Sequence, residues 1–514
     1  MESKGLSLPL TSEASPLVPS KAPSRQLFMC GLAVLGPGVL SALADSDAPC
    51  IFVAGDSGAR YGYSAIILLQ ILLVIPLFVT QELTVRLGVY TQLGFGACIR
   101  KEFGPAAAWV TFCFVFIINV LTTINELAGI AGACVVCGLD NMVGATIAAV
   151  LLLVIVQAPY RIVERIGIAL GLAELAFVVA WALARPDVPA TVVGFTKVVP
   201  TTMFTYVAAA NVGAVIPCWM VYFQQAAIAS KRMTAGKEEA VERMGSVVGA
   251  VTTQAIMVAT MCLLAATREA TGVRVIENVP DLSVVLQIAF GRTMGKALLA
   301  AGLIGGSGCA ALVVALTTSW ALCETLGLDT KKANPMDLPF WKAPAFYGTY
   351  LLVILVGLGV QLSGVTMEDM SLIALAANAF LMPLILAFLW LLATGPIMPE
   401  AVRVTGVHKW AVFVVFVVLS VFAVVSSAVG AIGWTVDDGG EEVASSFAHR
   451  HAYRADHFIS PANYNMSIGR SWVAVSRPQL SSMLSGPPPS APPLLYPTQS
   501  YDTRHDDYYE TRAS

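Results

Sequence analysis

Apolar segments of spanning length follow one another almost without interruption from about residue 26 to residue 434. A helix needs about 20 consecutive apolar residues to cross the hydrocarbon core of a bilayer. By that measure the pattern predicts an all-α integral membrane protein with about eleven transmembrane helices. These are expected near residues 28–57, 64–88, 105–134, 141–159, 163–183, 201–230, 245–267, 295–323, 345–363, 370–394 and 410–434.

Polar segments flank this transmembrane domain of residues 26–434 on both sides. Residues 1–25 are rich in Pro and Ser and lack the basic start and apolar stretch of a signal peptide, so we expect a disordered cytoplasmic tail. Beyond Trp434 the composition turns acidic and then rich in Pro, Ser and Tyr. This change predicts a second disordered tail over residues 435–514.

The composition narrows the possible functions. Hydrophobic residues make up 57% of the chain and charged residues only 12%, with a mean hydropathy of +0.74, whereas about a quarter of an ordinary soluble domain is charged. The net charge of −3 argues against a nucleic acid as partner, because such a partner requires a strongly basic surface. The sequence shows no nucleophile–base arrangement and no phosphate-binding loop, so we expect neither an enzyme nor a cofactor. The lipid bilayer is the partner that this composition predicts.

The positions of Lys and Arg predict the orientation of the chain, because these residues accumulate in cytoplasmic loops. With a cytoplasmic N-terminus, seventeen Lys and Arg residues fall in the inside segments and seven in the outside loops. We therefore expect a multi-pass protein of the plasma membrane or an endomembrane with its N-terminus in the cytoplasm. Eleven spans would then place the C-terminal tail outside the cytoplasm.

The first apolar segment contains a polar interruption near the middle of the bilayer, formed by Asp45, Asp47, Pro49 and Cys50. Pro49 lacks a backbone donor, so the helix should break just before it. A break leaves carbonyl groups free beside the carboxylates, which favours cation binding. Asp47 is the favoured ligand, since no Lys or Arg lies at this depth in any span. Asp45 is explained equally well as a ligand, as a helix cap or as a group facing an aqueous vestibule.

The sixth apolar segment is interrupted in a similar way, by Asn211, Gly213 and Pro217. Interrupted segments at corresponding places in two halves are typical of transporters built from inverted repeats. Asp47 and Pro217 lie 170 residues apart, which suits five spans per repeat. The predicted repeats are residues 26–185 and 198–395, followed by an additional helix at 409–434.

Other polar residues inside the apolar segments allow two interpretations. Glu126 is equally well explained by a part in an ion pathway and by a polar contact between helices, and the same holds, more weakly, for Glu174 and Asn378. Glu82 stands four residues before Arg86, a spacing that favours a structural ion pair on one helix face.

The stretches that carry these residues resemble one known family. Motifs of the NRAMP (natural resistance-associated macrophage protein) transporters, and of their magnesium-transporting branch in particular, are similar to GPGVLSALADSDA, SGARYGY, QELTVRLG and NVGAVIPCWMVYFQQAAIASK. The resemblance covers roughly residues 28–434. It implies the LeuT-type inverted-repeat fold of five plus five helices with helices 1 and 6 broken, and transport of divalent metal ions by alternating access.

The resemblance also implies site residues in the first broken helix. Typical members carry Asp-Pro-Gly-Asn there, with the Asp and the Asn as metal ligands. The corresponding residues are Asp47, Ala48, Pro49 and Cys50, so the Asp is kept and the Asn is replaced.

In the sixth helix typical members carry Met-Pro-His, with the Met sulfur and a carbonyl three residues earlier as ligands. The corresponding residues are Pro217, Cys218 and Trp219, and Ala214 would supply the carbonyl. Two further departures concern protons. A helix-6 His that typical members use in proton handling is Gln224, and an acidic position before Glu126 is Thr123. We therefore expect uptake driven by the membrane potential without coupling to protons.

The ligand types favour a hard cation. A thioether selects soft transition metals, whereas carboxylate, carbonyl and water ligands suit Mg²⁺, Ca²⁺ and Mn²⁺. Loss of the methionine therefore points to Mg²⁺ or Mn²⁺, with Asp47 as a direct ligand and Asp45 and Asn211 acting through water. Cys50 and Cys218 stand next to the two breaks, and two thiolates would favour Zn²⁺, although buried free Cys usually fills space as a small hydrophobe.

Two other functions compete with the transport of divalent cations. The first is a metal sensor or receptor that kept the fold and lost transport, which the altered motifs allow. The second is a sodium-coupled symporter for organic solutes, whose site presents half-helix N-termini to a substrate carboxylate. Asp45 and Asp47 oppose the second function, because they would repel an anion.

Overall fold

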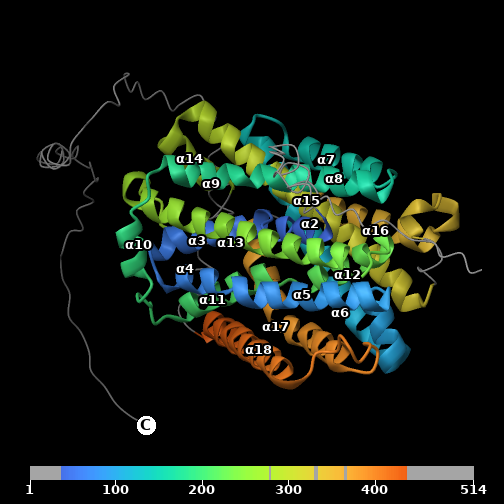
Figure 1. Ribbon diagram of the computed structural model, residues 1–514. Coiled ribbons are helices and arrows are strands. Elements are labelled where there is room, and N and C mark those ends of the chain that lie inside the picture. The colour runs from blue at the N-terminus through green and yellow to red at the C-terminus, as the bar shows by residue number, and fades with distance from the viewer. Residues whose placement is uncertain (1–35, 277–278, 329–333, 364–366, 437–514) are drawn as a thin grey trace, which may run out of the picture. The chain divides into compact units, whose positions relative to one another are not determined.

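The computed structural model describes residues 36–276, 279–328, 334–363 and 367–436, and all regular structure in these ranges is helical (Figure 1). The predicted tail at 1–25 and all but the first two residues of the predicted tail at 435–514 lie outside the described residues. The helices of the first half are α2 (Pro37–Leu43), α3 (Ala48–Tyr61), α4 (Ala65–Leu72), α5 (Val74–Thr91), α6 (Phe95–Val136), α7 (Asn141–Ile155), α8 (Tyr160–Gly171), η1 (Leu172–Glu174), α9 (Leu175–Leu183) and α10 (Val188–Gly194). Those of the second half are α11 (Thr202–Val215), α12 (Cys218–Lys231), α13 (Lys237–Thr271), α14 (Val279–Phe290), α15 (Arg292–Leu326), η2 (Pro335–Asp337), η3 (Phe340–Lys342), α16 (Pro344–Leu362), α17 (Met367–Thr394) and α18 (Gly406–Val436).

Within the described ranges, nine helices are long and apolar enough to cross a membrane, and ten if the bent pair α2 and α3 counts as one span. In their described parts the eleven predicted segments coincide with one helix or with consecutive helices. The fourth, predicted at 141–159, is the 15-residue helix α7, which is short for a span. It begins after Asp140, whose carboxylate caps it, and it ends at Ile155. The chain turns before Pro159, since the residue that precedes a proline is disfavoured in a helix. The short helices α10 and α14 were not predicted.

The two predicted helix breaks are present. Helix α2 ends at Leu43 and α3 begins at Ala48, and the two halves meet at an angle of 50°. Pro49 lies in the first turn of α3, where a missing N–H costs no hydrogen bond. Helix α11 ends at Val215 and α12 begins at Cys218, with Pro217 as its N-cap.

Helix α13 holds the short half-helix α2 at both ends. The Glu242 carboxylate accepts the backbone N–H of Gly38 at 2.6 Å, and the Thr253 hydroxyl donates to the carbonyl of Ala42. The two helices also pack closely, because a Cβ on Gly249 would lie 2.6 Å from the Cβ of Ala42. Side chains of α13 therefore fix the position of α2.

The outer surface suits contact with lipid. On α18 the exposed side chains of Val414, Val418, Val421 and Val425 recur at intervals of three and four residues, so they form one apolar stripe. A stripe of this kind on the outside of a helical membrane protein is the surface expected to face acyl chains.

The approach of α3 to α13 allows a test of the packing around the broken helix. A Cβ on Gly58 would lie 2.2 Å from the carbonyl oxygen of Met261, so Gly58→Ala must push the two helices apart. We expect this overpacking to cost about 1–3 kcal/mol and to lower the apparent melting temperature of the detergent-solubilised protein. Gly348→Ala in α16 is the matched control, because its new Cβ would meet no described atom within 4 Å. Equal melting temperatures for the two variants would contradict this packing.

Candidate functional site

The two helix breaks meet at a small cavity of ≈ 10 Å³, which is about the space that one water-sized sphere occupies. Its walls come from the α2–α3 break, the α11–α12 break, α6 and α17. The lining residues are Asp45, Asp47, Pro49, Cys50, Ile118, Thr122, Asn125, Ala214, Pro217, Trp219, Ala374, Leu375 and Asn378.

At the first break a carboxylate caps the second half-helix. Asp47 is the N-cap of α3, and its Oδ1 accepts the backbone N–H of Cys50 at 3.0 Å. In a continuous helix the carbonyls of Asp45 and Ser46 would accept from the residues four positions on. Those residues are Pro49, which has no N–H, and Cys50, whose N–H donates to Asp47. The carbonyls of Asp45 and Ser46 are therefore left without their helical hydrogen-bond donors, next to the carboxylate of Asp47.

At the second break a side-chain amide from α17 takes the place of the missing helical hydrogen bonds. Asn378 donates from Nδ2 to the carbonyl of Gly213 at 2.6 Å, and its Oδ1 accepts the N–H of Cys218 at 3.1 Å. These two backbone groups lie on either side of Pro217 in the chain. The polar residue Asn378 is therefore a clamp on the break as well as part of the cavity wall.

A thiol connects the two breaks. The Sγ of Cys50 lies 3.5 Å from the carbonyl oxygen of Ala214 and donates to it. Ala214 is the residue that the sequence predicted as the source of a carbonyl ligand, and its carbonyl does face the first break. Cys218 contributes its backbone N–H to the clamp but is not among the lining residues.

Several residues predicted for the site point elsewhere. Asn211 donates to the hydroxyl of Ser57 at 2.9 Å and to the carbonyl of Val207 at 2.8 Å, so its amide joins α11 to α3. Gln224 donates to Ser246 on α13. Both residues are buried, and neither lines the cavity; nor do Ala48 and Glu126.

Helix α6 contributes a cavity wall that the sequence interpretation missed. Ile118, Thr122 and Asn125 lie at intervals of four and three residues, so they share one face of the helix. The polar residues near Glu126 could have predicted this wall, because Thr122 stands one helical turn before Glu126 and Asn125 directly before it. Thr123, by contrast, packs against Gly357 of α16.

Carboxyl groups gather around the first break. Glu126 is fully buried and lies next to Asp47, the backbone of Ala48 and the Ser307 hydroxyl. Within the described chain, neither oxygen of Glu126 and neither oxygen of Asp45 has a hydrogen-bond partner. No group of three or more His, Cys, Asp or Glu side chains forms a complete metal cage in the described ranges. A cation here would therefore combine one or two carboxylates with carbonyl, amide and hydroxyl oxygens.

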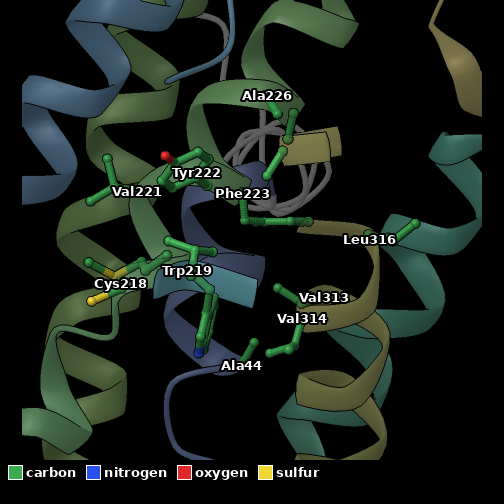
Figure 2. Close-up of a cluster of buried hydrophobic side chains, with 14 of the residues drawn as sticks. Ala44, Cys218, Trp219, Val221, Tyr222, Phe223, Ala226, Val313, Val314 and Leu316 are labelled. Atoms are coloured by element: carbon green, nitrogen blue, oxygen red, sulfur yellow. The ribbon is translucent and has the colours of Figure 1, made fainter. Parts of the chain in front are cut away.

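Trp219 covers one side of the cavity. Its side chain extends from α12 toward Ala44 at the end of α2 and toward Val313 and Val314 of α15 (Figure 2), and the residue is almost fully buried. The indole ring therefore forms part of the cavity wall on the α12 side.

A larger cavity of ≈ 530 Å³ lies between α5, α13 and the segment before α18. The lining residues Arg86, Glu239 and Arg243 belong to an ion-pair network with Glu82. Glu82 accepts from Arg86 at 2.6 Å, as predicted, and from Arg243 at 2.9 Å, and Arg243 also pairs with Glu239. Two acids and two bases balance in this network, so it is a structural tie between α5 and α13.

The Nramp family model, natural resistance-associated macrophage protein-like, matches residues 38–427. The chain belongs to this family. Nramp membership confirms the family resemblance, whereas the assignment to the magnesium branch stays a prediction.

Known Nramp relatives include two bacterial divalent metal cation transporters named MntH. The protein of Deinococcus radiodurans is 27% identical over 215 residues, which cover 40% of this chain and 49% of that protein. The protein of Brucella suis is 26% identical over 296 residues, which cover 55% of this chain and 64% of that protein. The chain thus spans about half to just under two thirds of the length of these relatives.

The fold is also shared with the solved structure of a metal transporter. The manganese transporter of Eremococcus coleocola superposes with a TM-score of 0.63 over 84% of this chain and 94% of that protein, at 16% identity. The predicted LeuT-type transporter fold is therefore confirmed. The cavity lies between the two broken helices of this fold, α2–α3 and α11–α12.

The Asn378 clamp is testable through stability. Asn378→Ala removes both hydrogen bonds and leaves the Gly213 carbonyl and the Cys218 N–H buried without this partner, at about 1–3 kcal/mol for each group. We expect a clear fall in the apparent melting temperature. Asn141→Ala is the matched control, because that amide makes one long contact of 3.5 Å with Gln361. A loss no larger for Asn378→Ala than for Asn141→Ala would argue against the clamp.

Proposed function

We propose that this chain transports divalent metal cations, Mg²⁺ or Mn²⁺, into the cytosol by alternating access at the cavity between the two breaks. The observation that carries the proposal is the meeting of the Asp47 carboxylate and the Ala214 carbonyl at that cavity. The names of the MntH relatives and of the manganese transporter support the same class of substrate.

The donor atoms around the cavity support a hard ion. Oxygen donors come from Asp47, Asp45, Thr122, Asn125 and the Ala214 carbonyl, and oxygen ligands suit Mg²⁺ and Mn²⁺. The nearest thioether in sequence, that of Met220, accepts a hydrogen bond from Gln81 on α5 and is not among the lining residues. Asp47 is the proposed direct ligand, with Asp45 acting through water.

We further propose that the membrane potential, without protons, drives uptake. Gln224 is uncharged and engaged with Ser246, so it supports a mechanism without a titrating group at that position. The excess of Lys and Arg in the predicted inside segments supports a cytoplasmic N-terminus. The buried carboxylates weigh against a symporter for organic anions. A metal sensor would bind ions at the same cavity without moving them, so flux separates it from a transporter.

The central test is the ion flux of an isosteric pair of variants in proteoliposomes at a fixed membrane potential. Asp47→Asn keeps an oxygen that can cap α3 but removes the charge, and loss of even an outer-shell partner of a metal costs about 10–100-fold in affinity or activity. We expect Mg²⁺ and Mn²⁺ flux to fall at least tenfold on that scale. Asp140→Asn at the exposed start of α7 should keep wild-type flux. Wild-type flux in Asp47→Asn would reject the site, and an imposed pH gradient that drives uptake would reject uncoupled transport.

The role of the cavity thiol is tested separately with Cys50→Ser. A serine hydroxyl can also donate to the Ala214 carbonyl, so Mg²⁺ and Mn²⁺ flux should stay close to the wild-type rate if the thiol is only a donor. Cys218→Ser, outside the cavity wall, is the control. Zn²⁺ flux in the wild-type protein that Cys50→Ser abolishes would instead identify a thiolate ligand and a softer ion.

A further inference from the structure

The larger cavity of ≈ 530 Å³ shares no lining residue with the proposed transport site and lies at the ends of membrane spans. Arg86 stands in the last two turns of α5 and Arg243 in the first two turns of α13, while Val402 belongs to the connection from α17 to α18. The ends of spans lie in the headgroup region that flanks the hydrocarbon core. The cavity is therefore at the depth of lipid headgroups, and its volume is within the range of about 300–1,000 Å³ typical of ligand sites.

The walls of this cavity change from polar to apolar along the spans. Arg86 and Arg243 stand at the polar end. On α5, Phe78 lies about two turns nearer the middle of the helix, and on α13, Val247 lies about one turn nearer. Beyond the cavity, the exposed side chain of Val251 continues the apolar face of α13 by one more turn. A space that is polar at the headgroup depth and apolar toward the membrane interior matches the amphipathic shape of a lipid.

The most exposed charge at the polar end is a guanidinium. Arg243 pairs with Glu82 and with Glu239 through Nη2 in both cases, so its Nη1 group takes part in neither ion pair. The Arg243 side chain is 36% exposed, whereas those of Glu82 and Glu239 are 13% and 10% exposed. The neighbouring acid Glu238 accepts hydrogen bonds from Thr234. The ion-pair network is therefore neutral in sum, but the group that it presents most openly is positive.

We propose that this cavity binds one phospholipid, with its phosphate at Arg243 and an acyl chain along the apolar faces of α5 and α13. The planar fork of N–H donors in a guanidinium suits the oxygens of a phosphate, and basic pockets between transmembrane helices are known to bind lipid headgroups. Because the phosphate is the recognised group, a lipid with the same chains and no phosphate binds less tightly. The bound lipid joins α5 to α13, the helix that holds α2.

The lipid that the purified full-length protein retains tests the proposal. The protein is reconstituted in vesicles of equal parts phosphatidylglycerol and a galactosyl diacylglycerol, extracted in mild detergent and weighed by native mass spectrometry. We expect one phosphatidylglycerol per wild-type chain, in clear excess over the glycolipid. Arg243→Gln should lower this retention by about tenfold, as expected for the loss of one charge-assisted hydrogen bond. Arg274→Gln is the matched control, because Arg274 is an exposed arginine that pairs with Glu269 and does not line the cavity.

A second variant blocks the apolar end of the cavity and leaves the charged residues in place. Val247→Trp puts a large ring where the acyl chain would lie, so the retained phosphatidylglycerol should fall as far as in Arg243→Gln. Val418→Trp is its control, because Val418 is an exposed valine in the apolar stripe of α18 and does not line the cavity. If Arg243→Gln fails to fold, the comparison of these two tryptophan variants carries the test.

Several outcomes would overturn the lipid site. A wild-type protein that retains no phosphatidylglycerol, or that retains both lipids in the proportion of the vesicles, has no site that recognises the phosphate. Retention at the wild-type level in Val247→Trp, or in a folded Arg243→Gln, would place the bound lipid elsewhere. Displacement of the retained lipid by glycerol 3-phosphate, which carries the phosphate without the chains, would reduce the cavity to a phosphate site and reject a phospholipid as its occupant.

Discussion

Inside a bilayer every backbone N–H and C=O group must find its partner within the protein, and the two helix breaks meet this constraint with side chains. The Asp47 carboxylate accepts the N–H of Cys50, and the Cys50 thiol donates to the carbonyl of Ala214. The Asn378 amide donates to the Gly213 carbonyl and accepts the Cys218 N–H. The residues that make the breaks tolerable are therefore the same residues that surround the cavity. Structure and site chemistry cannot be separated at these positions.

The same constraint makes α2 dependent on its neighbour. A helix of seven residues is too short to be stable alone, so its position follows from the contacts that Glu242, Thr253 and Gly249 of α13 make with it. Any movement of α2 that opens the cavity must break these contacts or carry α13 along. Because Arg243, which pairs with Glu239 on its own helix, also ties α13 to Glu82 on α5, a movement of α13 would strain that ion-pair network.

The sequence was informative where a residue type alone dictates the backbone. Pro49 and Pro217 located both breaks, and Asp47 stood out as a carboxylate at mid-membrane depth, because such features need no knowledge of neighbouring helices. Thr122 and Asn125 were missed, since the side of α6 that faces the breaks depends on how α6 packs. Asn211 was assigned to the site for the converse reason: it lies one turn before the second break, but its amide faces Ser57.

Asn378 shows the limit of a prediction made from residue type alone. An isolated Asn in an apolar helix is compatible with a ligand, a packing contact or a cap on another helix. Only the three-dimensional arrangement brings it opposite a proline 161 residues earlier in the chain. The number of spans illustrates a related limit, because α7 is apolar throughout but ends early at a turn before Pro159. The apolar composition of α7 predicted a position in the membrane, whereas the turn before Pro159 limits its length.

The closed cavity also constrains how an ion is selected. A space of ≈ 10 Å³ holds at most about one water, so an ion enclosed here must exchange most of its hydration shell for protein oxygens. Mg²⁺ gives up water reluctantly, and closure around it is therefore more costly than closure around Mn²⁺ unless the carboxylates compensate. Cys50 adds a second basis for selecting between hard and soft ions. While its thiol donates to the Ala214 carbonyl, it carries a proton and occupies one lone pair of that oxygen, leaving the other for a hard ion. A soft ion that needs a thiolate would have to break this hydrogen bond, and with it the direct link between the two helix breaks.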